Sequence, residues 1–189
     1  GNVTNSGDFT NNSGATTGDV SNTGTFTNSG TTGNVTNDGT FTNNSGGVIG
    51  TLTNNSGGTF TNFGTTGNWT NSGTITNSGT MGNGTNNSGA TFTNNSGGVT
   101  GVVTNSGTFT NNSGGTTGAV TNTGTFTNAG TTGNVTNSTF YPTFVNANNS
   151  SATPSTVYTT SGISINPSTN TLTVANQSVT SNATIGSNL

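Results

Sequence analysis

The chain has 189 residues, of which 23% are hydrophobic and 2% are charged, and its formal net charge is −3. It contains no Lys, Arg, His, Cys or Glu, so the usual general bases, thiolate and Schiff-base amine are missing, and we expect neither an enzyme nor a bound cofactor. Without basic residues the chain cannot neutralise phosphates, which argues against nucleic acid and anionic membrane surfaces as partners. No run is apolar enough for membrane insertion.

Most of the chain is a repeat in which every copy begins with a glycine. The copies start at Gly1, Gly18, Gly33, Gly50, Gly67, Gly82, Gly101, Gly118 and Gly133. The differences between these starts give unit lengths of 15, 17 or 19 residues. The longer copies contain one or two insertions of two residues each. At an insertion, the short Asn-Ser-Gly segment is replaced by Asn-Asn-Ser-Gly followed by one more residue. An insertion of two preserves the alternation of side chains along a strand, so the pattern favours β-strands over the disorder that the composition alone would suggest.

Two apolar columns and two asparagine columns run through the copies. The predicted core column contains Val20, Phe26, Val35, Phe41, Leu52, Phe60, Trp69 and Ile75. Two residues after each of these comes an asparagine, and the predicted structural ladder contains Asn22, Asn28, Asn37, Asn43, Asn54, Asn62, Asn71 and Asn77. Stacked inward amides can hydrogen-bond to the copies above and below. A third, weaker column includes Thr32, Ile49 and Met81.

These columns predict an all-β fold, a parallel β-solenoid of about eight to nine coils of 15–19 residues with three faces. With strands about 4.8 Å apart, the solenoid would be roughly 40 Å long. We expect the corners to lie at the Asn-Ser-Gly segments, where the glycine would supply a positive φ. Because the order of the faces recurs in every copy, we expect each coil to be closed within one chain rather than interwoven among three.

The threonines beside each phenylalanine are expected to point outward in two files. The candidate binding face consists of Thr25, Thr27, Thr40, Thr42, Thr59 and Thr61. Such files resemble those of ice-binding solenoids, but threonine is also a common residue on any exposed strand, and we favour this simpler explanation. The three acidic residues, Asp8, Asp19 and Asp38, do not repeat, so no metal site is predicted.

Two further features have structural explanations. Gly84 occupies the core position next to Trp69, and we expect it to leave room for the indole. The Asn-X-Ser/Thr sequons, such as Asn34-Val35-Thr36, follow from corners that are built of Asn, Ser and Thr.

The repeat ends near Asn137. The copy that starts at Gly133 is normal until Ser138-Thr139-Phe140, where the corner glycine is missing, so we divide the chain into a solenoid (1–137) and a C-terminal β-rich module (138–189). In the module, residues 157–160 and 163–165 are predicted strands, and residues 166–170 form a hairpin loop before Leu172 and Val174. Since the chain begins inside a repeat, we expect it to be part of a longer protein.

The C-terminal module resembles a module of bacteriophage tail fibres and related virion appendages. The matching segments are Tyr141-Pro142-Thr143-Phe144-Val145, Val157-Tyr158-Thr159-Thr160-Ser161-Gly162-Ile163 and Ile165-Asn166-Pro167-Ser168-Thr169-Asn170-Thr171-Leu172-Thr173. The resemblance implies a location on a virion, or otherwise outside the cell, and other fibre or virion proteins as partners, with a host surface glycan as a further one. It also implies a homotrimer joined through the module, chiefly by Phe144, Ile163, Ile165, Leu172 and Val174.

The sequence therefore indicates the structural shaft of an extracellular fibre, a phage tail fibre above all. The alternative is a solenoid that binds a surface, as a bacterial adhesin or as an ice-binding protein that uses the threonine files.

Overall fold

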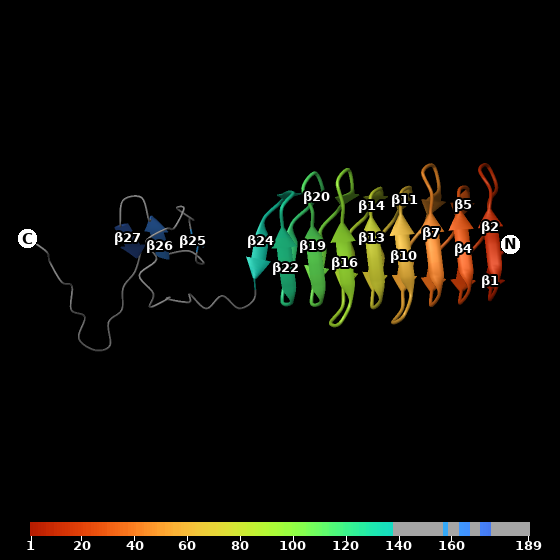
Figure 1. The fold of residues 1–189 in the computed structure, drawn as a ribbon, viewed down its shortest axis with the longest axis horizontal. Helices are drawn as coiled ribbons and strands as arrows, with labels where there is room; N and C mark the ends of the chain where they lie inside the picture. Colours follow the sequence, from red (N-terminus) through yellow and green to blue (C-terminus); the bar gives the residue numbers. More distant parts are fainter. Residues whose placement is uncertain (138–156, 159–162, 167–170, 175–189) are drawn as a thin grey trace, which may run out of the picture. The chain divides into compact units, whose positions relative to one another are not determined.

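The computed structural model describes residues 1–137, 157–158, 163–166 and 171–174. The chain forms two units, Gly1–Ser138 and Thr139–Leu189. The first unit is a parallel β-solenoid, in which each coil contributes strands to three sheets that we call A, B and C (Figure 1). The structure of residues 1–137 confirms the predicted fold class, and each coil closes on itself within the chain.

The three sheets are built from short strands. Sheet A contains β1 (Val3–Asn5), β3 (Val20–Asn22), β6 (Val35–Asn37), β9 (Leu52–Asn54), β12 (Trp69–Asn71), β15 (Gly84–Asn86), β18 (Val103–Asn105), β21 (Val120–Asn122) and β24 (Val135–Asn137). Sheet B contains β2 (Asp8–Asn11), β4 (Thr25–Asn28), β7 (Thr40–Asn43), β10 (Thr59–Asn62), β13 (Thr74–Asn77), β16 (Thr91–Asn94), β19 (Thr108–Asn111) and β22 (Thr125–Asn128). Sheet C contains β5 (Thr31–Thr32), β8 (Val48–Ile49), β11 (Thr65–Thr66), β14 (Thr80–Met81), β17 (Val99–Thr100), β20 (Thr116–Thr117) and β23 (Thr131–Thr132).

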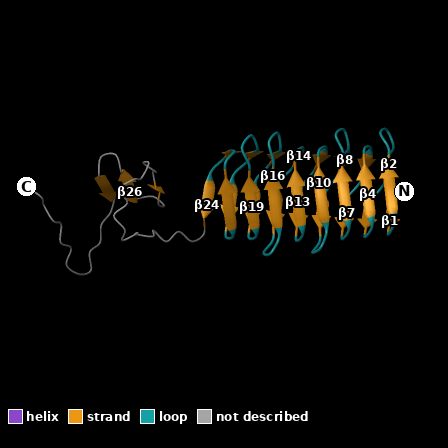
Figure 2. Ribbon diagram, viewed as in Figure 1, coloured by secondary structure: helices purple, strands orange, loops and turns teal. Residues whose placement is uncertain are grey.

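The insertions do not disturb the register between coils. Val35 of β6 pairs with Leu52 of β9, 17 residues later in the sequence. Phe41 of β7 pairs with Phe60 of β10, although 19 residues separate these two. Added residues are accommodated in the loops that project at the edges of the sheets (Figure 2). The same side chains therefore face the interior in every coil, as the even length of the insertions predicted.

The interior is a thin stack of one apolar side chain per strand in sheets A and B, except in β15, where Gly84 holds this position. All eight predicted core residues are buried, and Phe26 and Phe41 stack with ring centroids 4.6 Å apart. Sheet C adds the buried Ile49 and Met81 and a row of buried threonines. The third column therefore faces the core, and stacking of coils buries side chains that a single coil would expose.

Trp69 uses the space that Gly84 leaves. The indole is buried and packs 4.6 Å from the ring of Phe92, while its Nε1 donates a hydrogen bond to the carbonyl oxygen of Gly82 at 3.1 Å. A Cβ atom at Gly84 would overlap the indole ring. The structure confirms the packing explanation of this pair.

The expectation of a positive φ at the corner glycine was correct only for the long corners. There, Gly14, Gly46, Gly57, Gly89, Gly97 and Gly114 have φ between 78° and 87°. In the short corners the glycine has an ordinary φ, and it is needed for a different reason. A Cβ at Gly24, for example, would overlap the carbonyl oxygen of Gly7 in the preceding coil, so the glycine permits close stacking of backbones.

The described part of the C-terminal unit is a three-stranded antiparallel sheet. It contains β25 (Val157–Tyr158), β26 (Ile163–Asn166) and β27 (Thr171–Val174) in that order. Ile163 pairs with Val174 and Ile165 pairs with Leu172, which confirms the predicted pairing of the hairpin strands. The predicted strand residues 159–160 and loop residues 167–170 lie outside the described residues, as does Phe144, which is expected to contribute to a trimer.

Candidate functional site

The asparagine columns form two continuous hydrogen-bonded ladders inside the solenoid. In each ladder, the Nδ2 of one asparagine donates to the Oδ1 of the asparagine in the next coil, over 2.7–3.1 Å. Asn54 shows the full pattern, because its Nδ2 also lies 3.0 Å from the carbonyl oxygen of Gly58 and 3.1 Å from that of Thr74. The eight predicted ladder residues are all buried. An amide such as that of Asn54 therefore links its own corner to two strands of the next coil, and both its Nδ2 and its Oδ1 are hydrogen-bonded.

The ladders have a direction. Every donation runs from a coil to the following coil, so the amide dipoles are aligned head to tail along the solenoid. Aligned hydrogen bonds polarise and strengthen one another in a buried environment. This arrangement links successive coils along the solenoid, and it engages the ladder amides of all coils before the last.

A third ladder lies at the exposed corner between sheets C and A, and the sequence analysis missed it. Here a side-chain oxygen accepts a hydrogen bond from the backbone N–H of the equivalent residue one coil later. Asn68 Oδ1 accepts from Asn83 N at 3.0 Å, and Asn83 Oδ1 accepts from Val102 N at 2.9 Å. We call this column the corner file; its amide and carboxylate members in contact with the next coil are Asn2, Asp19, Asn34, Asn68 and Asn83.

The corner file and the backbone of the preceding coil together explain the glycines that begin the copies after the first, since at Gly67 and Gly118 a Cβ would meet backbone atoms instead of a side-chain oxygen. A Cβ at Gly18 would overlap Asn2 Oδ1, and a Cβ at Gly101 would overlap Asn83 Oδ1. The recurring Gly-Asn or Gly-Asp pair was a visible signal for this ladder. Thr51, Val102 and Ala119 interrupt the column, and Asp19 stands in it where most copies have asparagine. Asp19 takes the role of asparagine, because its Oδ1 accepts from Asn34 N at 2.8 Å.

The threonines of the candidate binding face lie in register on the outer side of sheet B. Thr25, Thr40 and Thr59 are paired in neighbouring strands and exposed. Thr27, Thr42 and Thr61 are also in register but half-buried. The two files therefore differ in accessibility, so that one file offers its hydroxyl and methyl groups to solvent more fully than the other.

Two depressions lie on the outer side of sheet A, between the corner file and the outward residues of the strands. The larger has a volume of about 430 Å³ and is lined by Asn68, Asn83, Thr85, Val102 and Thr104, with Trp69 and Gly84 beneath them. The smaller, of about 270 Å³, lies at the same place nearer to the N-terminus and includes Asp19 among its lining residues. The two depressions lie at equivalent places along the corner file and share no lining residue.

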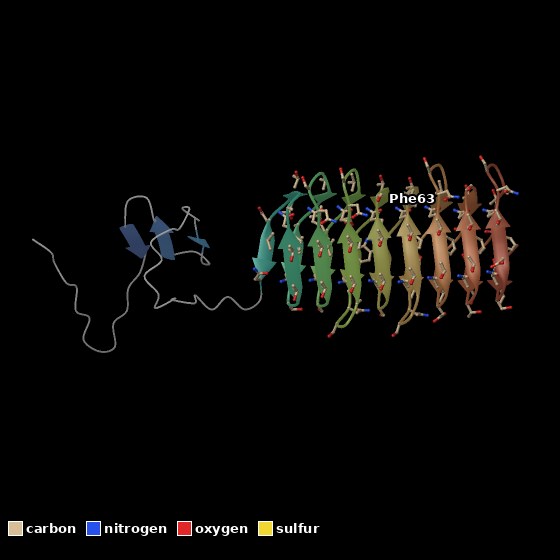
Figure 3. The ribbon with its side chains drawn as sticks, in the orientation of Figure 1. Phe63 is labelled. Atoms are coloured by element: carbon tan, nitrogen blue, oxygen red, sulfur yellow. The ribbon has the colours of Figure 1, made fainter. Side chains whose placement is uncertain are left out.

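The exposed apolar side chains are scattered. Phe63, at the corner that follows β10, is half exposed and stands at the edge of the solenoid (Figure 3). Val48 and Val99 lie on the outer side of sheet C, in strands separated by β11 and β14. Isolated apolar residues of this kind are normal on protein surfaces.

The described residues contain no group of three or more His, Cys, Asp or Glu side chains that could hold a metal ion. Asp8 lies on sheet B, Asp19 in the corner file, and Asp38 at a different corner, where it accepts a hydrogen bond from Asn55. Among the same residues, no helix has the length and the apolar character needed to cross a membrane.

No known protein family, curated protein or solved structure matches the chain.

Proposed function

We propose that the chain forms the structural shaft of an extracellular fibre, a phage tail fibre that provides reach and rigidity for host attachment. The observation that carries the proposal is the pair of asparagine ladders, which run without a break through the nine strands of sheet A and the eight strands of sheet B. A rod joined by aligned backbone and amide hydrogen bonds resists bending along its whole length. The buried polar side chains of residues 1–137 are all asparagines and threonines.

The resemblance of the C-terminal module supports the assignment to a virion. The matching segment from Ile165 to Thr173 includes the second half of β26 and all of β27 except Val174. Under this proposal the module joins three chains, and other fibre or virion proteins are bound outside the solenoid. The location is then a virion or another extracellular structure.

Light scattering on the intact chain, with electron microscopy of the same sample, tests the proposal. We expect three chains per particle and stiff projections that correspond to the solenoids. An intact chain that is monomeric at all concentrations would remove the main support for a fibre.

The second candidate is an ice-binding solenoid, and the observation in its favour is the register of the threonines on sheet B. The half-burial of Thr27, Thr42 and Thr61 weakens it, since only one file is well exposed. An assay of ice recrystallisation separates the two functions. We expect no inhibition by the intact chain, whereas inhibition that disappears in Thr40→Lys would favour the ice-binding candidate.

A further inference from the structure

We propose that the larger depression on sheet A is a binding site for a neutral glycan. The site lies between the corner file and the outward threonines of β15 and β18. It does not depend on assembly into a fibre, so it stands or falls separately from the function proposed above.

The corner file fixes two amide side chains that line this site. The Oδ1 atoms of Asn68 and Asn83 are held by the backbone N–H groups of Asn83 and Val102, at 3.0 and 2.9 Å. Within residues 1–137, neither Nδ2 group donates a hydrogen bond to the protein. Because the oxygen of each amide is fixed, both NH₂ groups are available as oriented donors to the hydroxyl groups of a ligand, at little cost in side-chain entropy.

The other lining residues match the mixed surface of a sugar. Thr85 and Thr104 provide hydroxyl groups that can donate and accept. Val102, which replaces an amide in the corner file, is 47% exposed and offers an apolar contact for the C–H face of a pyranose ring. Trp69 is only 3% exposed, so it forms the base of the depression and does not stack on a ligand.

Charge and spacing define the ligand class. None of the residues that line the larger depression is charged, and the chain has no Lys or Arg to pair with an acidic sugar. The volume of about 430 Å³ lies within the range of small-ligand sites. Successive coils are about 4.8 Å apart, close to the length of one hexose in an extended chain, so that the amides of Asn68 and Asn83 can contact consecutive sugars.

The corner between sheets C and A, which borders the site, carries no inserted residues in the described coils. Long corners with inserted residues occur only between sheets A and B or between sheets B and C, as at Gly57 and Gly46. The corner between sheets C and A has the same length in all coils. No inserted loop therefore interrupts the corner file, and an extended glycan chain can follow it past the site.

A printed array of neutral and acidic glycans, probed with the intact chain, tests the proposal. The positive neutral structures are then measured in solution by calorimetry, with a hexamer of α-2,8-linked sialic acid as the acidic comparison. We expect binding to neutral glycans and none to the sialic acid hexamer. Absence of binding to every neutral glycan, or binding to acidic glycans alone, would overturn the proposal.

The decisive variant is Asn68→Asp/Asn83→Asp. Asp19 shows that a carboxylate can serve in the corner file, so we expect the fold and the thermal unfolding temperature to be kept. The variant removes both NH₂ donors, and binding should weaken by at least about tenfold. The matched control is Asn134→Asp, which makes the same change in the same column outside the site. Undiminished binding by the double variant, or an equal loss in the control, would contradict the assignment.

Discussion

At the scale of the residue, each ladder asparagine serves three coils. Asn71 receives a hydrogen bond from Asn54, donates to Asn86, and also donates to the carbonyl oxygen of Thr91. Removal of one side chain therefore affects the coils on both sides. The neighbouring Thr70 lies in the same strand, but its side chain is exposed on the outer side of the sheet.

Substitution Asn71→Ala should leave the Nδ2 of Asn54 without its ladder acceptor and the Oδ1 of Asn86 without its donor. Because both groups are buried, we expect a loss of about 1–3 kcal/mol in the free energy of unfolding. Chemical denaturation measures it, with Thr70→Ala as the control. Equal stabilities of the two variants would show that the ladder does not hold the coils together.

The pair Trp69 and Gly84 offers a second test at this scale. Gly84→Val places a side chain in the volume of the indole, and overpacking of this kind costs about 1–3 kcal/mol. The double variant Trp69→Val/Gly84→Val should regain much of the lost stability. It places valine, the commonest residue of this column, at both positions between Leu52 and Val103. Thermal unfolding of the two variants measures the coupling. A double variant that is no more stable than Gly84→Val would contradict this packing explanation.

At the scale of the element, corners vary while strands do not. The long corner after β7 contains Asn44, Ser45, Gly46 and Gly47, and the short corner after β4 contains Ser29 and Gly30. Gly47 and Gly30 occupy equivalent positions. A Cβ at Gly47 would overlap Oδ1 of Asn43 in the same coil, and a Cβ at Gly30 would overlap the carbonyl oxygen of Ala15 in the preceding coil. Any shortening of the long corner must therefore keep Gly47.

Deletion of Ser45 and Gly46 together should convert this corner to the short form and leave the fold intact. Deletion of Gly46 alone should reverse the faces of the following strand or force a bulge, and lower the unfolding temperature markedly. Circular dichroism during heating compares the two. If both deletions were tolerated equally, the parity of the strands would not control the insertions.

Columns buried by stacking were the part of the structure that sequence could predict. The core residues and the ladder asparagines recur because each must contact its own equivalent, as Phe41 contacts Phe60. The corner file was missed because its exposed members can be replaced, as at Thr51 and Val102, with the loss of one hydrogen bond only. The depression on sheet A could not be predicted, since it depends on side chains from three coils.

At the scale of the whole molecule, the absence of basic residues limits electrostatic contributions. The chain has no Lys, Arg or His to form side-chain ion pairs. Stability of the solenoid should then depend on burial and neutral hydrogen bonds. We expect the unfolding temperature to change by less than about 2 °C between about 0.01 M and 0.1 M ionic strength, over which the screening length falls from about 30 to about 10 Å. Calorimetry tests it, and a strong salt dependence would point to charge interactions as a source of stability.

A truncation after Asn137 separates folding from assembly. Each coil closes within one chain, so the remaining solenoid should fold as a monomer with β-type circular dichroism. The intact chain should be a trimer under the proposed function. Light scattering distinguishes these states, and a solenoid that folds only as a trimer would contradict the independence of the single-chain coil.

Every strand of the solenoid is hydrogen-bonded to the equivalent strand of a neighbouring coil, and this pairing has a mechanical consequence. Tension applied to the two ends of the solenoid, along its axis, acts across the hydrogen bonds between strands and loads the terminal coil first. Coils should therefore peel off one at a time, each releasing 15–19 residues, or roughly 50–70 Å of extended chain. A shaft of this type is stiff under bending but extensible in discrete steps under pull, so that a sudden load is absorbed by the end coils while the rest stays folded.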